Sequence, residues 1–329
     1  MKITSFFLIL FAINSLSAQS HLPTIRFEDI KIIPHDQAFQ KTKIGGLSGI
    51  TRGLQVDEYL VVADKPNARY YTVTINEEFE IAFQGLTYTL PKKGENESLR
   101  IHPATKVLYI ADERNRKTSL LKNQLDGQSP DEIMLPKKFK KMRQNSGFEG
   151  MTFSDDGKRL FLGLESALIT ESNCGITDKV SGITRILELD LAGKAVAEYA
   201  YPLLNLANKG LSGNGLTELL HWKEDLLLVL ERAYFPILKK NSIRIYLINL
   251  AEADNIQHLN ICNLPDDTKI LHPILLFDFE KAISEGQLKR IDNAEGMCWS
   301  HDKSQLIIVT DNNFNASQET QFVQLSFKK

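Results

Sequence analysis

The sequence repeats one β-hairpin pattern five times, and this repeat limits the possible folds more than any other feature. Each unit has a small or acidic residue, an apolar strand, a polar turn, a second apolar strand and then a carboxylate. The five units cover residues 46–64, 97–113, 148–165, 216–231 and 294–311. Self-similarity of this kind indicates a repeat architecture.

The spacing within the units supports the pattern. From Glu97 to Glu113, and between the corresponding residues of three other units, the step is 16 residues. From Thr217 to Glu231 it is 14, as expected if one hairpin turn has lost two residues. A further β-rich stretch follows each closing carboxylate, so each unit predicts three or four antiparallel strands.

Strand-rich units that recur about every 50 residues predict an all-β fold, a β-propeller. About 311 residues follow position 18, which suffices for six blades of roughly 50 residues each. We therefore expect six blades, with five or seven as alternatives. The wider spacing late in the chain would hold insertions or a degraded blade, and Leu275–Leu288 looks like a short helical insertion. The strand Thr24–Ile33 would complete the last blade and close the ring.

The N-terminus has the pattern of a signal peptide. Met1 and Lys2 give a positive start, Phe6–Ile13 is a compact apolar run, and Ser15–Ala18 supplies small residues for cleavage. The alternative is a buried N-terminal helix. We expect residues 1–18 to be the signal peptide and residues 19–329 a single propeller domain, exported to the periplasm or secreted. No second apolar run follows, so no membrane span is expected.

The charge and the cysteines exclude several classes of protein. Lys and Arg total 39 and Asp and Glu total 41, a balance that does not support a nucleic-acid partner. We expect a monomer. Cys174, Cys262 and Cys298 are too few and too scattered for a disulfide framework, and their odd number leaves at least one thiol unpaired. Cys298 lies in an apolar stretch, where the role of a small buried hydrophobe is expected.

The repeated carboxylates are the first candidate site. Equivalent positions of a propeller form a ring around its axis, and a hairpin brings its start and its finish to the same edge. We therefore expect eight carboxylates at one end of the central channel. Glu97, Glu149 and Glu295 start the hairpins. The closing positions are Asp64, Glu113, Glu165, Glu231 and Asp311.

So many negative charges would repel one another unless a cation offsets them. Oxygen ligands suit Ca²⁺, which takes six to eight of them. All eight carboxylates are therefore predicted metal ligands, with Ca²⁺ as the cofactor. Neutral oxygens would come from Asn145, Asn293, Asn312 and Asn313. The alternative is that each carboxylate faces water or a neighbouring arginine.

Several cations lie close to these carboxylates in the sequence. The basic run 137–141 with Arg143 precedes Asn145, while Arg114 and Arg232 directly follow ring carboxylates. The two arginines are either ion-pair partners or phosphate ligands. We expect Arg114, Arg143, Asn145 and Arg232 to bind a small anionic substrate, phosphorylated molecules included. No nucleophile elbow or phosphate-binding loop is present, so no catalytic residue is named.

At this point the sequence resembles a known family, the exported phytase-like proteins described by the phrase "esterase-like activity of phytase". The similarity covers roughly residues 40–325. It rests on the segments 45–50, 145–150, 228–232, 293–297, 310–314 and 318–321. One departure is Glu95-Asn96-Glu97, where an Asp-x-Glu pair is expected. The resemblance implies a propeller, export and a phosphoester hydrolase.

Together these features favour a Ca²⁺-dependent hydrolase of phosphoesters or esters, acting on small anionic substrates. Two alternatives remain. One is a non-catalytic ligand-binding propeller, which the absence of a nucleophile motif favours. The other is a metal-dependent lactonase, since other six-bladed propellers hold a catalytic cation in an acidic channel.

Overall fold

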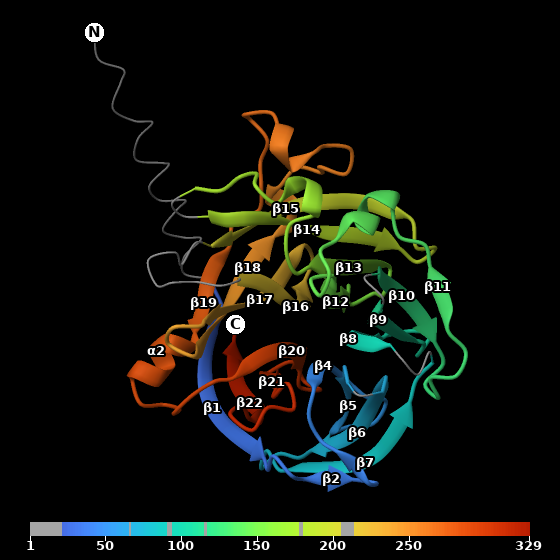
Figure 1. The fold of residues 1–329 in the computed structure, drawn as a ribbon, viewed down its shortest axis with the longest axis vertical. Coiled ribbons are helices and arrows are strands. Elements are labelled where there is room, and N and C mark those ends of the chain that lie inside the picture. Colours follow the sequence, from blue (N-terminus) through green and yellow to red (C-terminus); the bar gives the residue numbers. More distant parts are fainter. Residues whose placement is uncertain (1–21, 66, 91–93, 115–116, 178–179, 205–213) are drawn as a thin grey trace.

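The computed structural model describes residues 22–65, 67–90, 94–114, 117–177, 180–204 and 214–329. Five four-stranded antiparallel sheets stand around a central axis in these residues, and together they form a β-propeller (Figure 1). The innermost strands of neighbouring sheets contact one another all the way around the ring. The predicted signal peptide, residues 1–18, lies outside the described residues.

Four of the sheets, or blades, use four consecutive strands each, arranged from the axis outward in chain order. Blade 1 contains β4 (Leu47–Arg52), β5 (Glu58–Ala63), β6 (Arg69–Ile75) and β7 (Ile81–Tyr88). Blade 2 contains β8 (Glu95–Ile101), β9 (Leu108–Arg114), β10 (Lys117–Asn123) and β11 (Asp131–Ile133). Blade 3 contains β12 (Phe148–Phe153), β13 (Arg159–Leu164), β14 (Val180–Asp190) and β15 (Ala195–Leu204). Blade 4 contains β16 (Asn214–Lys223), β17 (Leu226–Phe235), β18 (Lys240–Asn249) and β19 (Ile274–Asp278).

Blade 5 joins the two ends of the described chain. Its strands are β20 (Asn293–Trp299), β21 (Gln305–Asp311), β22 (Thr320–Lys328) and, outermost, β1 (Thr24–Ile33). β1 pairs antiparallel with β22, from Thr24 opposite Lys328 to Ile33 opposite Thr320. The expected closure by the N-terminal strand is confirmed, and the ring is fastened by backbone hydrogen bonds between two distant segments.

The described residues form five blades, not the six expected from the chain length. Each of the five sequence repeats supplies the inner hairpin of one blade, so the repeats alone give the number. The extra length in the second half lies in long strands such as β14 and β18 and in the connection 250–273. Within Leu275–Leu288 only Phe279–Ser284 is helical, as α2, because Ile274–Asp278 is the outer strand of blade 4.

The remaining elements are short and lie in the connections. They are the hairpin strands β2 (Ala38–Phe39) and β3 (Thr42–Lys43) and the 3₁₀ helices η1 (Lys137–Lys141), η2 (Ile169–Glu171), η4 (Leu250–Glu252) and η5 (Ile261–Asn263). None of the helices in the described part of the chain is long and apolar enough to span a membrane.

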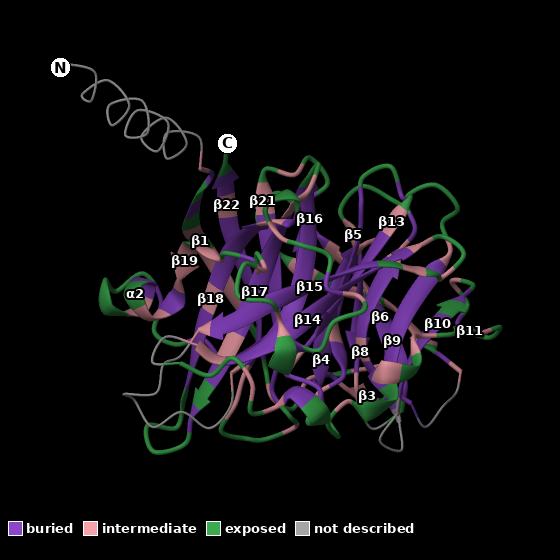
Figure 2. Ribbon diagram, turned by 90° about the horizontal axis from the view of Figure 1, so that it is seen from above, coloured by how far each residue is buried: buried purple, intermediate pink, exposed green. Residues whose placement is uncertain are grey.

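The hydrophobic core is divided among the contacts between neighbouring blades. Figure 2 shows buried strands between exposed connections at both ends of the ring. Leu99 of blade 2, for example, packs in one cluster with Leu60 and Val62 of blade 1. Cys298 of blade 5 packs with Ile50 of blade 1, and burial raises the pKa of its thiol to about 12. Its expected role as a small buried hydrophobe is confirmed.

A buried ion pair links the innermost strands across the axis. Arg100 of β8 is 5% exposed, and its Nη2 lies 2.8 Å from Oε2 of Glu218 on β16. Its guanidinium also donates to main-chain carbonyls of β4, β8, β16 and β20, among them Ile50 (2.8 Å) and Met297 (3.0 Å). Glu218 accepts from the backbone N–H of Met151 on β12 at 3.0 Å. The pair therefore reaches all five blades.

Replacing Arg100 with Met should lower the free energy of unfolding by about 3–5 kcal/mol, because Glu218 would remain buried without its counter-charge. The double variant Arg100→Met with Glu218→Gln should recover part of this loss. Urea unfolding at pH 7.5 measures both. The exposed Lys122→Met serves as control and should change stability by less than about 0.5 kcal/mol. A loss below about 1 kcal/mol for Arg100→Met would contradict a central role for the pair.

Candidate functional site

Every innermost strand has a β-bulge at the same level of the ring. The pairing of each inner strand with its neighbour skips one residue, and the skipped residues occupy equivalent positions in the five blades. They are Ser48, Glu97, Glu149, Thr217 and Glu295. A bulge changes the direction in which a side chain leaves the strand, and bulges are frequent next to active sites. Three of the five positions hold a glutamate, and we call these three the central glutamates.

Glycine follows the bulge in three blades because neighbouring inner strands approach closely there. A Cβ atom on Gly296 would lie 2.7 Å from Cα of Gly49, and one on Gly150 would lie 2.7 Å from the backbone N of Leu219. No side chain fits at those distances. The glycines of the repeated Glu-Gly and Ser-Gly pairs in the sequence therefore have a packing cause.

The structure brings the central glutamates together. Burial first, and then the negative charges of Glu149 and Glu295, raise the pKa of Glu97 well above its ordinary value. The pKa values of Glu149 and Glu295 are raised in the same way, with Glu165 and Asp311 respectively as their strongest negative neighbours. Neither Glu97 nor Glu149 forms a side-chain hydrogen bond with another described residue. A group of partly buried, mutually repelling carboxyls holds protons at pH values where a fully exposed glutamate is ionised.

Two of the closing carboxylates, Asp64 and Asp311, lie at the edge of this group. Burial raises both pKa values, that of Asp311 to about 7; the negative charge of Asp64 adds to the rise at Asp311, and that of Glu95 adds to the rise at Asp64. Lys65 lies 3.5 Å from Asp64 and partly offsets this effect. The other oxygen of Asp64, Oδ1, is buried without a hydrogen-bond partner in the described structure.

Two other closing carboxylates instead accept hydrogen bonds from the backbone or from side chains of neighbouring strands. Glu113 accepts from the backbone N–H groups of Asn145 (2.7 Å) and Gly147 (3.3 Å), and so it fixes the segment that leads into β12. Glu231 accepts from the hydroxyl of Tyr201 at 2.6 Å and from the amide of Asn214 at 3.2 Å. These contacts give both carboxylates a role in positioning strands.

Arg232 is the cation that lies against the acidic group. Its Nη2 is 2.8 Å from Oε1 of Glu165, and its Nη1 is 3.1 Å from Oε1 of Glu295. Nη1 also donates to the side-chain oxygen of Asn293. One guanidinium thus joins blades 3, 4 and 5, and its charge lowers the pKa of Glu295 against the effect of burial.

A cleft of about 930 Å³ opens beside this group over blades 3, 4 and 5. Glu165 and Arg232 belong to both the cleft and the acidic group. Five cationic residues line it, against the two acidic residues Glu165 and Asp292. The cations are Arg143, Arg232, Lys239, Lys240 and Arg290. The cleft is therefore suited to an anion.

The predicted substrate ligands divide between the cleft and other places. Arg143, Asn145 and Arg232 line the cleft, and so do Asn293 and Asn313. The side chain of Arg114, which ends β9, lies outside the described residues. Asn312 is buried and accepts from the backbone N–H groups of Gly46 (3.2 Å) and Phe314 (3.0 Å), which makes it part of the loop structure.

The acidic group suits Ca²⁺ in its chemistry. Carboxylate oxygens are the ligands that Ca²⁺ prefers. However, no three His, Cys, Asp or Glu residues of the described chain are placed so that they could hold one metal ion. Arg232 already supplies positive charge to two of the carboxylates.

Comparisons with known proteins agree with this geometry. Residues 42–314 match the model of the phytase-like family, whose description is "Esterase-like activity of phytase". The chain belongs to the phytase-like family. No curated protein matches the sequence significantly.

Solved structures resemble this phytase-like chain in fold. The endo-arabinase from Bacteroides thetaiotaomicron VPI-5482 aligns with a TM-score of 0.52 at 11% identity, over 92% of this chain and 99% of that one. U3-55K aligns with a TM-score of 0.43 at 8% identity, over 90% and 98% of the two chains. The RRP9 WD40 repeats give 0.44 at 8%, over 92% and 99%. At 11% identity, the likeness to the endo-arabinase concerns the fold alone.

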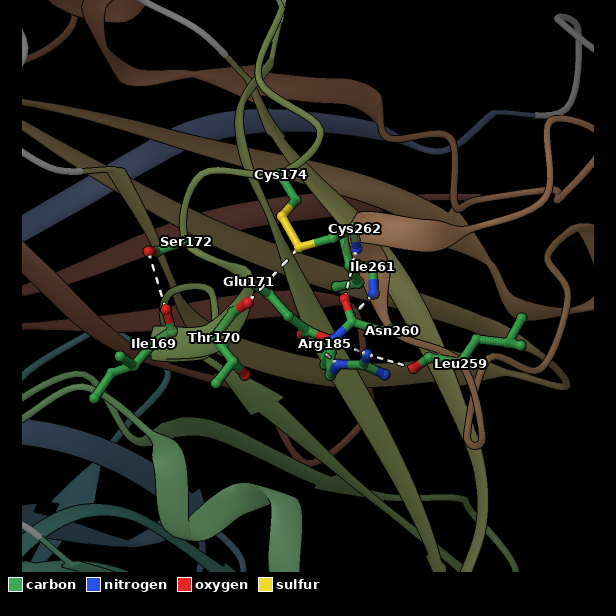
Figure 3. Close-up of a disulfide and its surroundings, with 10 residues drawn as sticks. All are labelled: Ile169, Thr170, Glu171, Ser172, Cys174, Arg185, Leu259, Asn260, Ile261 and Cys262. Carbon is green, nitrogen blue, oxygen red and sulfur yellow. Dashed lines mark hydrogen bonds and ion pairs between the residues drawn. A yellow bond between two sulfur atoms is a disulfide. The ribbon is translucent and has the colours of Figure 1, made fainter.

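A disulfide fastens one wall of this phytase-like propeller (Figure 3). Cys174, in the loop after β13, is bonded to Cys262 of η5, which belongs to the long connection after β18. Beside it, Glu171 accepts from Arg185 at 2.6 Å and from the backbone N–H of Ile261 at 3.1 Å. As expected, the cysteines form no framework and one thiol, that of Cys298, is free. The pairing of the other two was not expected.

The acidic group should make the protein less stable as the pH rises. The pKa of Asp311 is raised to about 7 and the pKa values of the central glutamates are raised well above their ordinary value, so the folded chain binds more protons than the unfolded chain between about pH 4.5 and pH 7. The stabilisation is therefore complete below about pH 4.5 and is lost as the pH rises through 7. Urea unfolding of chelator-treated protein at pH 5 and pH 8 measures the effect.

Glu149→Gln removes one member of this group and should raise stability at pH 8 by about 1 kcal/mol, because like-charge repulsion falls. The difference between pH 5 and pH 8 should shrink in this variant. The exposed Glu77→Gln is the matched control and should leave the difference unchanged. Equal pH dependence in Glu149→Gln and in the wild type would show that Glu149 is not a member of the repelling group.

Proposed function

We propose that this phytase-like protein hydrolyses phosphoesters, or related esters, of small anionic molecules outside the cytoplasm. One observation carries the proposal. Three carboxyls with raised pKa values converge at the axis, and they adjoin a polar cleft whose lining holds five cationic residues against two acidic ones. The family description, which names esterase-like activity of phytase, supports the same class of reaction.

The cations of the cleft would bind the anionic part of the substrate. Arg232 and Arg290 are paired with acidic side chains, and Lys240 with Glu280. Arg143 and Lys239 have no ion-pair partner in the described part of the chain and are exposed. These two charges are thus available to a ligand, and arginine suits phosphate in particular because its N–H groups match two oxygens at once.

The carboxyls would supply acid and base. Glu149, among the negative charges of Glu165 and Glu295, is held protonated and can give its proton to the leaving oxygen. Glu295 contacts Arg232, whose charge favours the ionised form, and can take the proton of an attacking water. The water oxygen bonds to the phosphorus or carbonyl carbon as the ester bond breaks. The pKa values of both carboxyls are raised, so the division of roles rests on the direct contact of Glu295 with Arg232.

Hydrolysis of a generic phosphomonoester, phytate and simple esters, with chelator and with added Ca²⁺, tests the proposal. Glu149→Gln should lower kcat by about 100-fold or more, as loss of a general acid does. Arg143→Gln should act mainly by raising KM, because it removes a binding charge. The exposed Lys122→Gln is the control for a lost positive charge and should leave both constants unchanged.

The outcomes separate the alternatives. No turnover of any of these esters in either condition would refute the hydrolase. Turnover of lactones without turnover of phosphoesters would identify a lactonase. Saturable binding of a phosphomonoester without turnover of any substrate would identify a ligand-binding propeller.

Ca²⁺ remains the second part of the proposal, supported by the number of carboxylates at one end of the channel. If it binds, it stabilises the folded state by mass action. Ca²⁺ should then raise the Tm of chelator-treated protein more than Mg²⁺ does, because many carboxylates suit the larger ion. Glu295→Gln should weaken this response. An unchanged Tm, with no metal bound, would mean that Arg232 and bound protons alone balance the acidic group.

Export is also part of the proposal. The N-terminal sequence predicts a signal peptide, and the bond between Cys174 and Cys262 is typical of an oxidising compartment. We also propose that the protein is a monomer and that it has neither a nucleic-acid partner nor a membrane span.

A further inference from the structure

A second cavity, of about 300 Å³, lies at the opposite end of the central channel from the cleft. The cleft is lined by residues at the starts of the inner hairpins, whereas this cavity is lined by their turns. Gly53, Pro103, Ser154 and His301, from the turns of four blades, all belong to its wall. We call it the hairpin-turn cavity. Arg100 and the buried ion pair separate it from the central glutamates.

The wall of the hairpin-turn cavity is positively charged. It contains four cationic side chains and two histidines, against Asp155 as its one acidic residue. The basic residues are Arg52, Arg100, Lys106, His221, His301 and Lys303. Asp155 already contacts two of these basic residues, because its Oδ1 lies 2.5 Å from Nζ of Lys303 and 3.3 Å from Nδ1 of His221.

Two of these cations contact no acidic side chain in the described structure. Arg52 donates only to the carbonyl oxygen of His301, at 3.1 Å. Lys106 donates only to the carbonyl oxygen of Pro103, at 2.6 Å. Neither contact neutralises the charge, so two positive charges from blades 1 and 2 face one cavity with hydrogen-bonding capacity left over.

A second observation points to a ligand. Nε of Arg100 is buried without a hydrogen-bond partner in the described residues, although the side chain lines the cavity and is almost completely enclosed. The other two guanidinium nitrogens are fully used by carbonyls and Glu218. A buried N–H without an acceptor is unfavourable, and such groups usually have a partner in the functional state.

We propose that the hairpin-turn cavity binds a small oxyanion of the phosphate type, as a free ion or as a small phosphomonoester. Arg52 and Lys106 supply the charge, and Arg100 supplies a donor at the inner end. The volume admits a phosphate with a small organic group. This site is separate from the cleft, and it does not depend on the proposed hydrolysis.

The two tryptophans of the chain allow this site to be observed separately. Trp299 lines the cavity and donates from Nε1 to the carbonyl oxygen of His221 at 2.8 Å. Trp222 and Trp299 both pack against Phe327, whereas the described lining of the cleft contains no tryptophan. Intrinsic fluorescence therefore reports on the hairpin-turn end of the channel.

The experiment is a fluorescence titration with potassium phosphate, and in a second arm with glycerol phosphate, at ionic strength held constant with KCl. We expect a saturable change in the wild type. The double variant Arg52→Gln with Lys106→Gln should bind about tenfold more weakly or worse, because two charge-assisted hydrogen bonds are lost. The cleft variant Arg143→Gln with Lys239→Gln loses the same charge and should titrate like the wild type.

The single variant Lys106→Gln, at an exposed position, gives a milder test should the double variant unfold, and it should also weaken binding. Saturation by both ligands would show that the site recognises the phosphate group that they share. Saturation by potassium phosphate alone would identify the free ion as the ligand, and saturation by glycerol phosphate alone would identify a phosphomonoester. No saturable change with either ligand would overturn the proposal. It would also be overturned if the Arg52 and Lys106 variants bound as tightly as the wild type, or if the cleft variant lost binding equally.

Discussion

The rest of the structure depends on how Arg100 and Glu218 are placed. The innermost strands of a propeller expose polar backbone groups toward the axis, where water has little access. One arginine and one glutamate satisfy such groups on all five blades. A buried ion pair is tolerated only when its remaining hydrogen-bonding capacity is used. Here carbonyls from several blades use both terminal nitrogens of Arg100, while its Nε has no partner among the described residues, and the pair thereby joins the strands around the axis.

The pair also separates two ends of opposite charge. On one side the bulges direct Glu97, Glu149 and Glu295 toward the axis, and on the other the hairpin turns carry Arg52, Lys106 and Lys303. Because the intervening channel is closed by side chains, the two sets cannot neutralise each other directly. The acidic end is balanced by Arg232 and by raised pKa values, which keep protons on the carboxyls.

Much of this arrangement could be predicted from the sequence, because a hairpin repeat fixes which residues are equivalent. The five inner hairpins, the closing strand β1 and the convergence of the central glutamates follow from the 16-residue step. The expected number of six blades was wrong because it was taken from the chain length, and long strands such as β14 lengthen the repeat without adding a blade. Arg100 has no equivalent in the other repeats, and Cys174 and Cys262 lie 88 residues apart, so neither contact leaves a local pattern. The roles of Glu113 and Glu231 depend on loop conformations that their strand positions do not encode.

Two arginines near the axis show how exposure decides what the same side chain can do. Arg100 is enclosed and bonded to carbonyls that cannot move away, so it serves the fold. Arg232 is bonded to the side chains of Glu165, Glu295 and Asn293, and its own side chain, 23% exposed, lines the cleft. An anion entering the cleft would compete with those carboxylates for the same N–H groups. Since the charge of Arg232 lowers the pKa of Glu295, such competition would raise that pKa and make Glu295 a stronger base. Binding of an anion would thus change the proton affinity of the group proposed to act on it, without any movement of the strands.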